Sequence, residues 1–130
     1  TNYTLDLGNI SDVGVTSKNY DATTTIGTIC NANTNYSLYL GDGQNRIPGS
    51  YRRMKNGSDF LPYQLYKNAS RTTVWDATGG VTNVGGSGGL LLSGSGGLQN
   101  SIVYGRIPQN VSMPNSVGQY TDTVVVTVTY

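Results

Sequence analysis

The sequence predicts an all-β fold, an antiparallel β-sandwich formed by a single domain over residues 1–130. Apolar residues recur at every second position in several short runs, which is the period of a β-strand, and helical spacing is nearly absent. Only 12% of the residues are charged, and Thr, Ser, Asn, Gly and Tyr are abundant. Strand faces solvated by Thr and Ser are typical of an all-β protein, and a chain of this length can bury one core.

Six runs account for the predicted strands, and turn residues separate them. They cover residues 3–7, 23–30, 36–40, 60–66, 101–107 and 121–130. The Gly-Asp-Gly of residues 41–43 ends the third run in the manner of a hairpin turn. Pro62 places the fourth run at a sheet edge or at the start of a strand.

The last run is the clearest, because one face is apolar and the opposite face is mostly threonine. The apolar face consists of Val124, Val126, Val128 and Tyr130. A half-buried strand of an antiparallel sandwich has this pattern. The sequence ends within this strand and no partner strand follows it, so we expect the sandwich to be one strand short.

Residues 79–97 form a low-complexity segment that holds about half of the 18 glycines. Such a segment is expected to be flexible and to pack no core of its own. Leu90, Leu91 and Leu92 in its middle therefore allow two interpretations. They form a short strand at the edge of the sandwich, with the glycines as flexible connectors, or they project from one end and contact a hydrophobic surface.

The composition argues against catalysis. The chain has no His, no Glu and one Cys, which excludes Ser-His-Asp and Cys-His triads and His-based metal sites. Seven scattered Asp residues leave only a glycosidase-like carboxylate pair formally possible. We therefore predict no catalytic site, no metal site and no cofactor.

The charge distribution gives no reason to expect a nucleic-acid partner, since the net charge is only +1. Arg52, Arg53 and Lys55 form one short basic cluster. We expect a solvated loop in which Arg53 makes a local ion pair, and the alternative is a binding patch.

The only cysteine, Cys30, lies at the end of the second run. A free buried cysteine is common, but a lone cysteine in a secreted domain indicates a missing disulfide partner. No segment is apolar over the roughly 20 residues that a membrane-spanning helix needs, and the N-terminal residues do not have the pattern of a signal peptide. Both interpretations of Cys30 stay open on these grounds.

Several blocks of the sequence resemble the spore coat protein U domain, which is shared with pilins of archaic, Csu-type chaperone–usher pili. The central block comprises Arg53-Met54 and residues 61–75, LPYQLYKNASRTTVW. Residues 103–108, VYGRIP, resemble the next block, and residues 118–130, GQYTDTVVVTVTY, resemble the C-terminal block with its aromatic last residue. LDLG at residues 5–8 and IC at residues 29–30 fit the start of the domain. The blocks occur in the family's order and cover almost the whole chain.

The resemblance implies an incomplete immunoglobulin-like sandwich whose last strand comes from another protein. In this family a periplasmic chaperone fills the gap, and at the outer-membrane usher the N-terminal segment of a neighbouring pilus subunit replaces it. The resemblance thus implies secretion through the periplasm to a pilus on the cell surface. It assigns Val124, Val126 and Val128 to the lining of the groove. It also assigns the Tyr130 carboxylate to contact with basic residues of the chaperone.

Two departures from the family pattern matter. Family pilins carry an N-terminal donor segment and a cysteine shortly before the position of Leu5, and that cysteine pairs with the one at the position of Cys30. This chain begins at Thr1, so we expect that it lacks upstream residues, through trimming or because it is one domain of a longer protein. The second departure is the glycine-rich segment with Leu90, Leu91 and Leu92, which resembles the apolar loops that archaic tip adhesins present to hydrophobic surfaces.

These considerations predict a pilus subunit or tip-adhesin domain that assembles by donor-strand complementation and mediates cell attachment and biofilm formation. We expect the protein not to be an enzyme. The alternative is a structural protein of a spore coat or cell envelope with the same fold.

Overall fold

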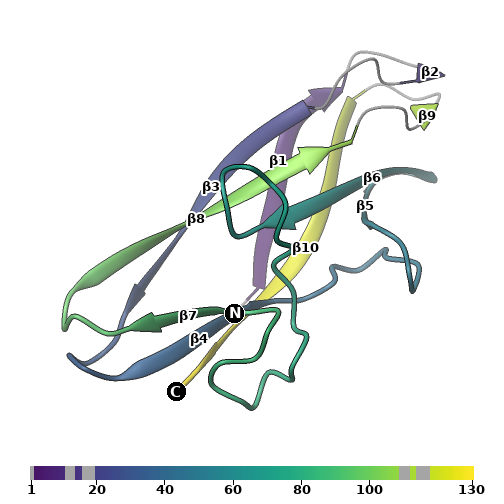
Figure 1. Cartoon of the computed structure of the whole chain (residues 1–130). Helices are drawn as coiled ribbons and strands as arrows, with labels where there is room; N and C mark the ends of the chain where they lie inside the picture. The colour runs from purple at the N-terminus through teal and green to yellow at the C-terminus, as the bar shows by residue number, and fades with distance from the viewer. Residues whose placement is uncertain (1, 11–13, 16–19, 109–111, 114–117) are drawn as a thin grey trace.

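The computed structural model describes residues 2–10, 14–15, 20–108, 112–113 and 118–130 (Figure 1). These residues form β-strands joined by turns and loops, and no helix occurs among them. The described part of the chain accordingly offers no helix that could cross a membrane. The strands are β1 (Asn2–Ile10), β2 (Gly14–Val15), β3 (Tyr20–Ile29), β4 (Asn35–Leu40), β5 (Arg52–Asn56), β6 (Asp59–Tyr66), β7 (Leu90–Ser93), β8 (Leu98–Ile107), β9 (Ser112–Met113) and β10 (Gly118–Thr129). The predicted all-β fold is confirmed.

All strand pairs are antiparallel, and the main path of pairing runs β3-β8-β6-β5-β10-β4-β7, with β1 beside β10. Two strands change partners along their length. β6 pairs with β5 through residues 59–63 and with β8 through residues 64–66. β10 pairs with β1 and β5 in its first two thirds and with β4 at its end. These changes turn the path back on itself as an open sandwich, in which β4 and the end of β10 lie opposite β3, β8 and β6 (Figure 1).

One apolar core lies between the layers. Its members come from β3, β4, β5, β6, β8 and β10 and from the loop after β6: Ile26, Tyr36, Leu38, Leu40, Met54, Leu61, Tyr63, Leu65, Trp75, Val103, Ile107, Tyr120, Val124 and Val126. Trp75 is fully buried and links the layers, because its backbone N–H donates to Leu65 O of β6 and its indole Nε1 donates to Leu38 O of β4, both at 2.9 Å. A buried indole N–H needs such a partner.

The glycine-rich segment packs closely against the outer face of β4. Tyr39 is fully buried there, its hydroxyl donates to Asn83 O, and the same hydroxyl accepts from the Gly86 N–H at 2.9 Å. A Cβ atom on Gly86 would lie 2.5 Å from the Tyr39 hydroxyl oxygen, and one on Gly89 would lie 2.6 Å from Tyr39 Cε1. The expectation that these glycines are only flexible connectors is therefore wrong at these positions, where glycine permits the close approach of the backbone.

The basic cluster also differs from the expectation. Arg52 is buried and belongs to β5. Arg53 makes no ion pair with any described residue; its Nε donates to Asn45 O at 2.6 Å, and its guanidinium lies 4.0 Å from the centre of the Phe60 ring. The expected solvated loop with an Arg53 ion pair is therefore wrong, and the side chain of Arg52 is not available to a binding patch.

Candidate assembly groove

The side chains on the inward face of β10 become more exposed toward the end of the strand. Val124 and Val126 are 2% and 7% exposed, whereas Val128 and Tyr130, on the same face, are 41% and 85% exposed. The layer that covers the first two residues therefore does not reach the last two. Large apolar side chains on an inward face are exposed only where a covering element is absent.

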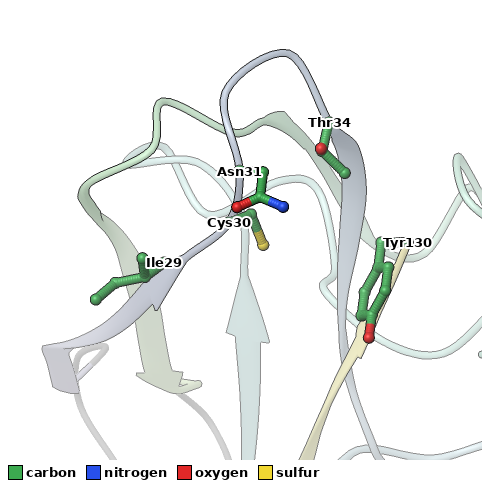
Figure 2. A pocket seen from close by; sticks show the side chains of 5 residues that line it. All are labelled: Ile29, Cys30, Asn31, Thr34 and Tyr130. Carbon is green, nitrogen blue, oxygen red and sulfur yellow. The ribbon is translucent and has the colours of Figure 1, made fainter.

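The other wall of this opening is the end of β3. Ile29, Cys30, Asn31, Thr34 and Tyr130 line a pocket of about 260 Å³, and Figure 2 shows Cys30 between Ile29 and Tyr130. Cys30 is a free thiol that packs partly against the core, while Ile29 is 70% exposed. The structure thus brings together two residues that the sequence analysis singled out separately, Cys30 and Tyr130. We call this opening, from Val128 and Tyr130 across to Ile29 and Cys30, the groove.

The strands beside the groove are incompletely paired. β3 forms one end of the pairing path, with β8 as its partner over all ten residues. On β10, Val125 faces Asn2 of β1 and also accepts from the Gly41 N–H that follows β4, so β1 and β4 flank β10 on opposite sides. The described part of β1 reaches only as far as Val125, whereas β4 continues to Thr129. Among the described residues, the end of β10 therefore has no strand partner beyond Val125 on the side of β1, and strand edges of this kind can add a further strand.

The three leucines lie in β7, which pairs with β4 at the edge of the sandwich. Leu90 and Leu92 pack partly buried against the core, and Leu91 points outward with 57% of its surface exposed. This arrangement is the edge strand of the first interpretation. A role of these leucines in adhesion stays a prediction, and Leu91 is the one whose side chain is available for it.

The positions in β7 give a testable difference in stability. Replacing Leu90 and Leu92 together by Ser is expected to lower the free energy of unfolding by about 3 kcal/mol, because both lose apolar contacts and introduce a hydroxyl at the core. Leu91→Ser is expected to change it by less than about 0.5 kcal/mol. Urea denaturation of the three proteins measures both values, and equal losses would contradict the assignment of the two faces.

A buried polar cluster, which the sequence analysis missed, stabilises the region on the other side of β10. Arg52 is 1% exposed. Its Nε donates to Gly41 O at 2.9 Å, its Nη2 donates to Leu40 O at 3.2 Å and to Trp75 O at 2.7 Å, and its Nη1 donates to Gln64 Oε1. Burial lowers the pKa of the Arg52 guanidinium, which has neutral oxygens as partners.

Asp122 is the centre of a second set of buried polar contacts and is 3% exposed. Its Oδ1 accepts from the backbone N–H groups of Gln44 and Thr123, both at 2.9 Å, and its Oδ2 accepts from the Tyr63 hydroxyl. Burial and then the hydrogen bond to Asp122 raise the pKa of the Tyr63 phenol far above its usual range. Asp122 lies two residues before Val124 in the alternating pattern, and this spacing was the signal that it points inward.

Comparisons with known proteins agree with this architecture. The Spore Coat Protein U domain model matches residues 1–127. Protein U of Myxococcus xanthus is 35% identical over 100 residues, which cover 72% of this chain and 51% of that protein. A chain in the crystal structure of the CsuC–CsuE chaperone–tip adhesion subunit pre-assembly complex, from archaic chaperone–usher Csu pili of Acinetobacter baumannii, covers all of this chain with a TM-score of 0.60. The identity is 23%, and the match covers 39% of that chain.

The structural match at this low identity concerns the fold, and this chain spans about half the length of the curated relative that it matches. The match of the family model extends over nearly all residues, from β1 into the end of β10. The resemblance seen in the sequence blocks is thereby confirmed: the chain belongs to the Spore Coat Protein U domain family.

Proposed function

We propose that the chain is a subunit of a chaperone–usher pilus and that its groove is filled by a β-strand from a neighbouring subunit. The observation that carries this proposal is the exposure of Val128 and Tyr130 on the face that buries Val124 and Val126. A strand with alternating apolar residues would cover these side chains and pair with the end of β10. The fold likeness to a chain from a chaperone–tip adhesion subunit complex supports this proposal.

The proposed partners follow from this mode of assembly. Before assembly, a periplasmic chaperone would protect the groove, and an outer-membrane usher would exchange the chaperone for the neighbouring subunit. The subunit would then reside in a pilus on the cell surface. Attachment to apolar surfaces is a further part of the proposal, with Leu91 as the exposed apolar side chain of β7; Leu91→Ser is expected to reduce attachment to plastic without loss of stability.

The proposal is tested by adding a synthetic peptide of alternating apolar residues to the 130-residue chain. Peptide at about 100 times its Kd stabilises the folded state by about 2.7 kcal/mol, which corresponds to a rise in melting temperature of about 10 °C for a domain of this size. Differential scanning calorimetry measures the shift. If the chain alone melts cooperatively at high temperature and the peptide does not raise its melting temperature, the proposal that a strand fills the groove is wrong.

Two valines with similar exposure provide a matched control. Val128, 41% exposed, lies on the face of the groove, and Val125, 46% exposed, lies on the opposite face. Val128→Asp is expected to abolish the shift caused by the peptide, since it places an unpaired charge against an apolar strand. Val125→Asp is expected to retain the shift. Loss of the shift in both variants, or in neither, would contradict the assigned face.

Cys30 is proposed to pair with a cysteine in a segment joined to Thr1. Cys30 is a free thiol that is only partly buried and lines the pocket it shares with Tyr130, so a further segment of the chain can reach it. Such a disulfide typically contributes about 2–5 kcal/mol to a small secreted domain. Peptide mapping of the secreted protein without reduction tests the pairing, and an alkylated Cys30 would overturn it.

A structural protein of a spore coat or cell envelope is the second candidate. Its support is the family description itself together with the relative from Myxococcus xanthus, whose identity of 35% exceeds the 23% of the pilus-related structure. Chaperone and usher genes beside the gene for this chain would favour the pilus subunit.

A further inference from the structure

A second opening lies away from the groove, where the loop after β4 meets β5 and β10. It is a pocket of about 410 Å³ lined by Gln44, Asn45, Lys55, Gly57, Thr121, Asp122 and Thr123. We call it the polar pocket. Its volume is in the range of small-molecule sites, roughly 300–1,000 Å³, but such sites are usually lined by apolar side chains. Every described lining residue of the polar pocket is polar or glycine.

The floor of the polar pocket is held rigidly. The carboxylate of Asp122 is 3% exposed and is fixed by the backbone N–H of Gln44, by Tyr63 and by the Asn45 amide, whose Nδ2 lies 3.4 Å from Asp122 Oδ1. Gly43 brings the loop this close to β10, since a Cβ atom there would lie 1.9 Å from Asp122 Oδ2. The loop and the strand are thus fixed relative to each other before any ligand arrives.

Other polar side chains also line the polar pocket. Among the described residues, no hydrogen-bond or ion-pair partner is found for four lining side chains: Gln44, Lys55, Thr121 and Thr123. Together they carry an amide, an ammonium group and two hydroxyls, so the lining of the polar pocket contains both donors and acceptors. Asp122, in contrast, has its oxygens occupied by the donors that fix it.

The chemistry of the polar pocket restricts its ligand. A β-strand cannot add here, because Thr121 already pairs with Lys55 of β5 on one side and with Asp6 of β1 on the other. An apolar ligand would leave the lining groups unsatisfied. Lys55 and Asp122 bring one charge of each sign to the described lining, which favours neither an anion nor a cation. A neutral ligand covered with hydroxyl groups fits these conditions.

We propose that the polar pocket binds an uncharged pyranose unit of a polysaccharide, held by Gln44, Lys55, Thr121 and Thr123. This site is separate from the groove and does not depend on the proposed assembly. The protein would thereby hold a hydrated glycan surface by a contact other than the apolar one of Leu91.

The test is a titration of the ¹⁵N-labelled 130-residue chain with glucose, galactose, N-acetylglucosamine and N-acetylgalactosamine, followed by NMR. At least one sugar is expected to shift the amide signals of Lys55, Thr121 and Thr123 in a saturable way, with a Kd of about 1 mM. The signals of β7 are expected to stay unchanged. Because the groove is not involved, the result is expected with or without the complementing peptide.

A matched pair of variants locates the site. Gln44→Ala combined with Thr123→Val is expected to weaken binding about tenfold, the loss of two hydrogen bonds. Thr127→Val, the same substitution on the same face of β10 but outside the lining, is expected to leave the Kd unchanged. The proposal is overturned if no sugar gives a saturable shift, if the double variant binds as well as the parent chain, or if the complementing peptide rather than a sugar shifts these signals.

Discussion

Replacing Arg52 by Met is expected to destabilise the domain more than any other single change at a charged residue. The guanidinium satisfies Gly41 O, Leu40 O, Trp75 O and Gln64 Oε1 inside the protein. Each acceptor that is left unsatisfied in a buried site costs about 1–3 kcal/mol, so a loss of at least about 4 kcal/mol is expected. The free energy of unfolding of such a domain is about 5–15 kcal/mol in total, so this loss removes a large share of it. Urea denaturation is expected to show the transition at a much lower urea concentration than in the parent chain.

The neighbouring arginine is the control for this experiment. Arg53 makes one hydrogen bond, to Asn45 O, and stacks on Phe60 at a partly exposed position. Arg53→Met is expected to cost about 1 kcal/mol, since a cation–π contact and one hydrogen bond at the surface contribute little. If the two variants lose similar stability, Arg52 does not hold the loop after β4 to the core.

Gly43→Ala is also expected to destabilise the domain strongly, with a loss of about 3 kcal/mol in the free energy of unfolding. The new methyl group would lie 1.9 Å from Asp122 Oδ2, and φ is +78° at this position. The residue would meet both the strain of a left-handed conformation, about 1 kcal/mol, and the displacement of a buried carboxylate from its donors, about 1–3 kcal/mol. Thermal unfolding of the variant measures the loss.

Gly49 separates these two contributions. It has a similar φ of +81°, but a Cβ atom there would meet nothing within 4 Å. Gly49→Ala is therefore expected to show the backbone strain alone, about 1 kcal/mol. Equal losses at the two glycines would mean that the contact with Asp122 contributes nothing.

The alternating pattern predicted most strands well, because half-buried strands carry their burial in their own residues. The runs at residues 36–40 and 60–66 lie within β4 (Asn35–Leu40) and β6 (Asp59–Tyr66). β5 was missed, since its inward-facing residues include Arg52 and a buried cation does not look like a core residue in a sequence. Arg52 can be buried because carbonyl groups of Leu40 and Trp75 accept its hydrogen bonds. These partners are distant from Arg52 in the sequence.

The groove formed with Val124, Val126, Val128 and Tyr130 stays a prediction. The structure adds that the first two are covered and the last two exposed, a division that depends on where the opposite layer ends. Periodicity contains no information about that boundary. The alternating pattern also does not indicate which strands pair with each other. The pairing of β10 with β1, β4 and β5 could therefore not be predicted from residues 121–130 alone.

The central place of β10 has a consequence for the kinetics of folding. Its partners in β1 begin at Asn2, opposite Val125, and the other long ladder joins β3 to β8, so most of the ordering contacts link residues far apart in the chain. Such a topology folds in milliseconds to seconds rather than microseconds. Before β10 pairs with them, β1, β4 and β5 have exposed strand edges, and these edges can pair with other chains. A protein that binds β10 early would therefore change the rate at which the correctly folded chain accumulates, in competition with aggregation.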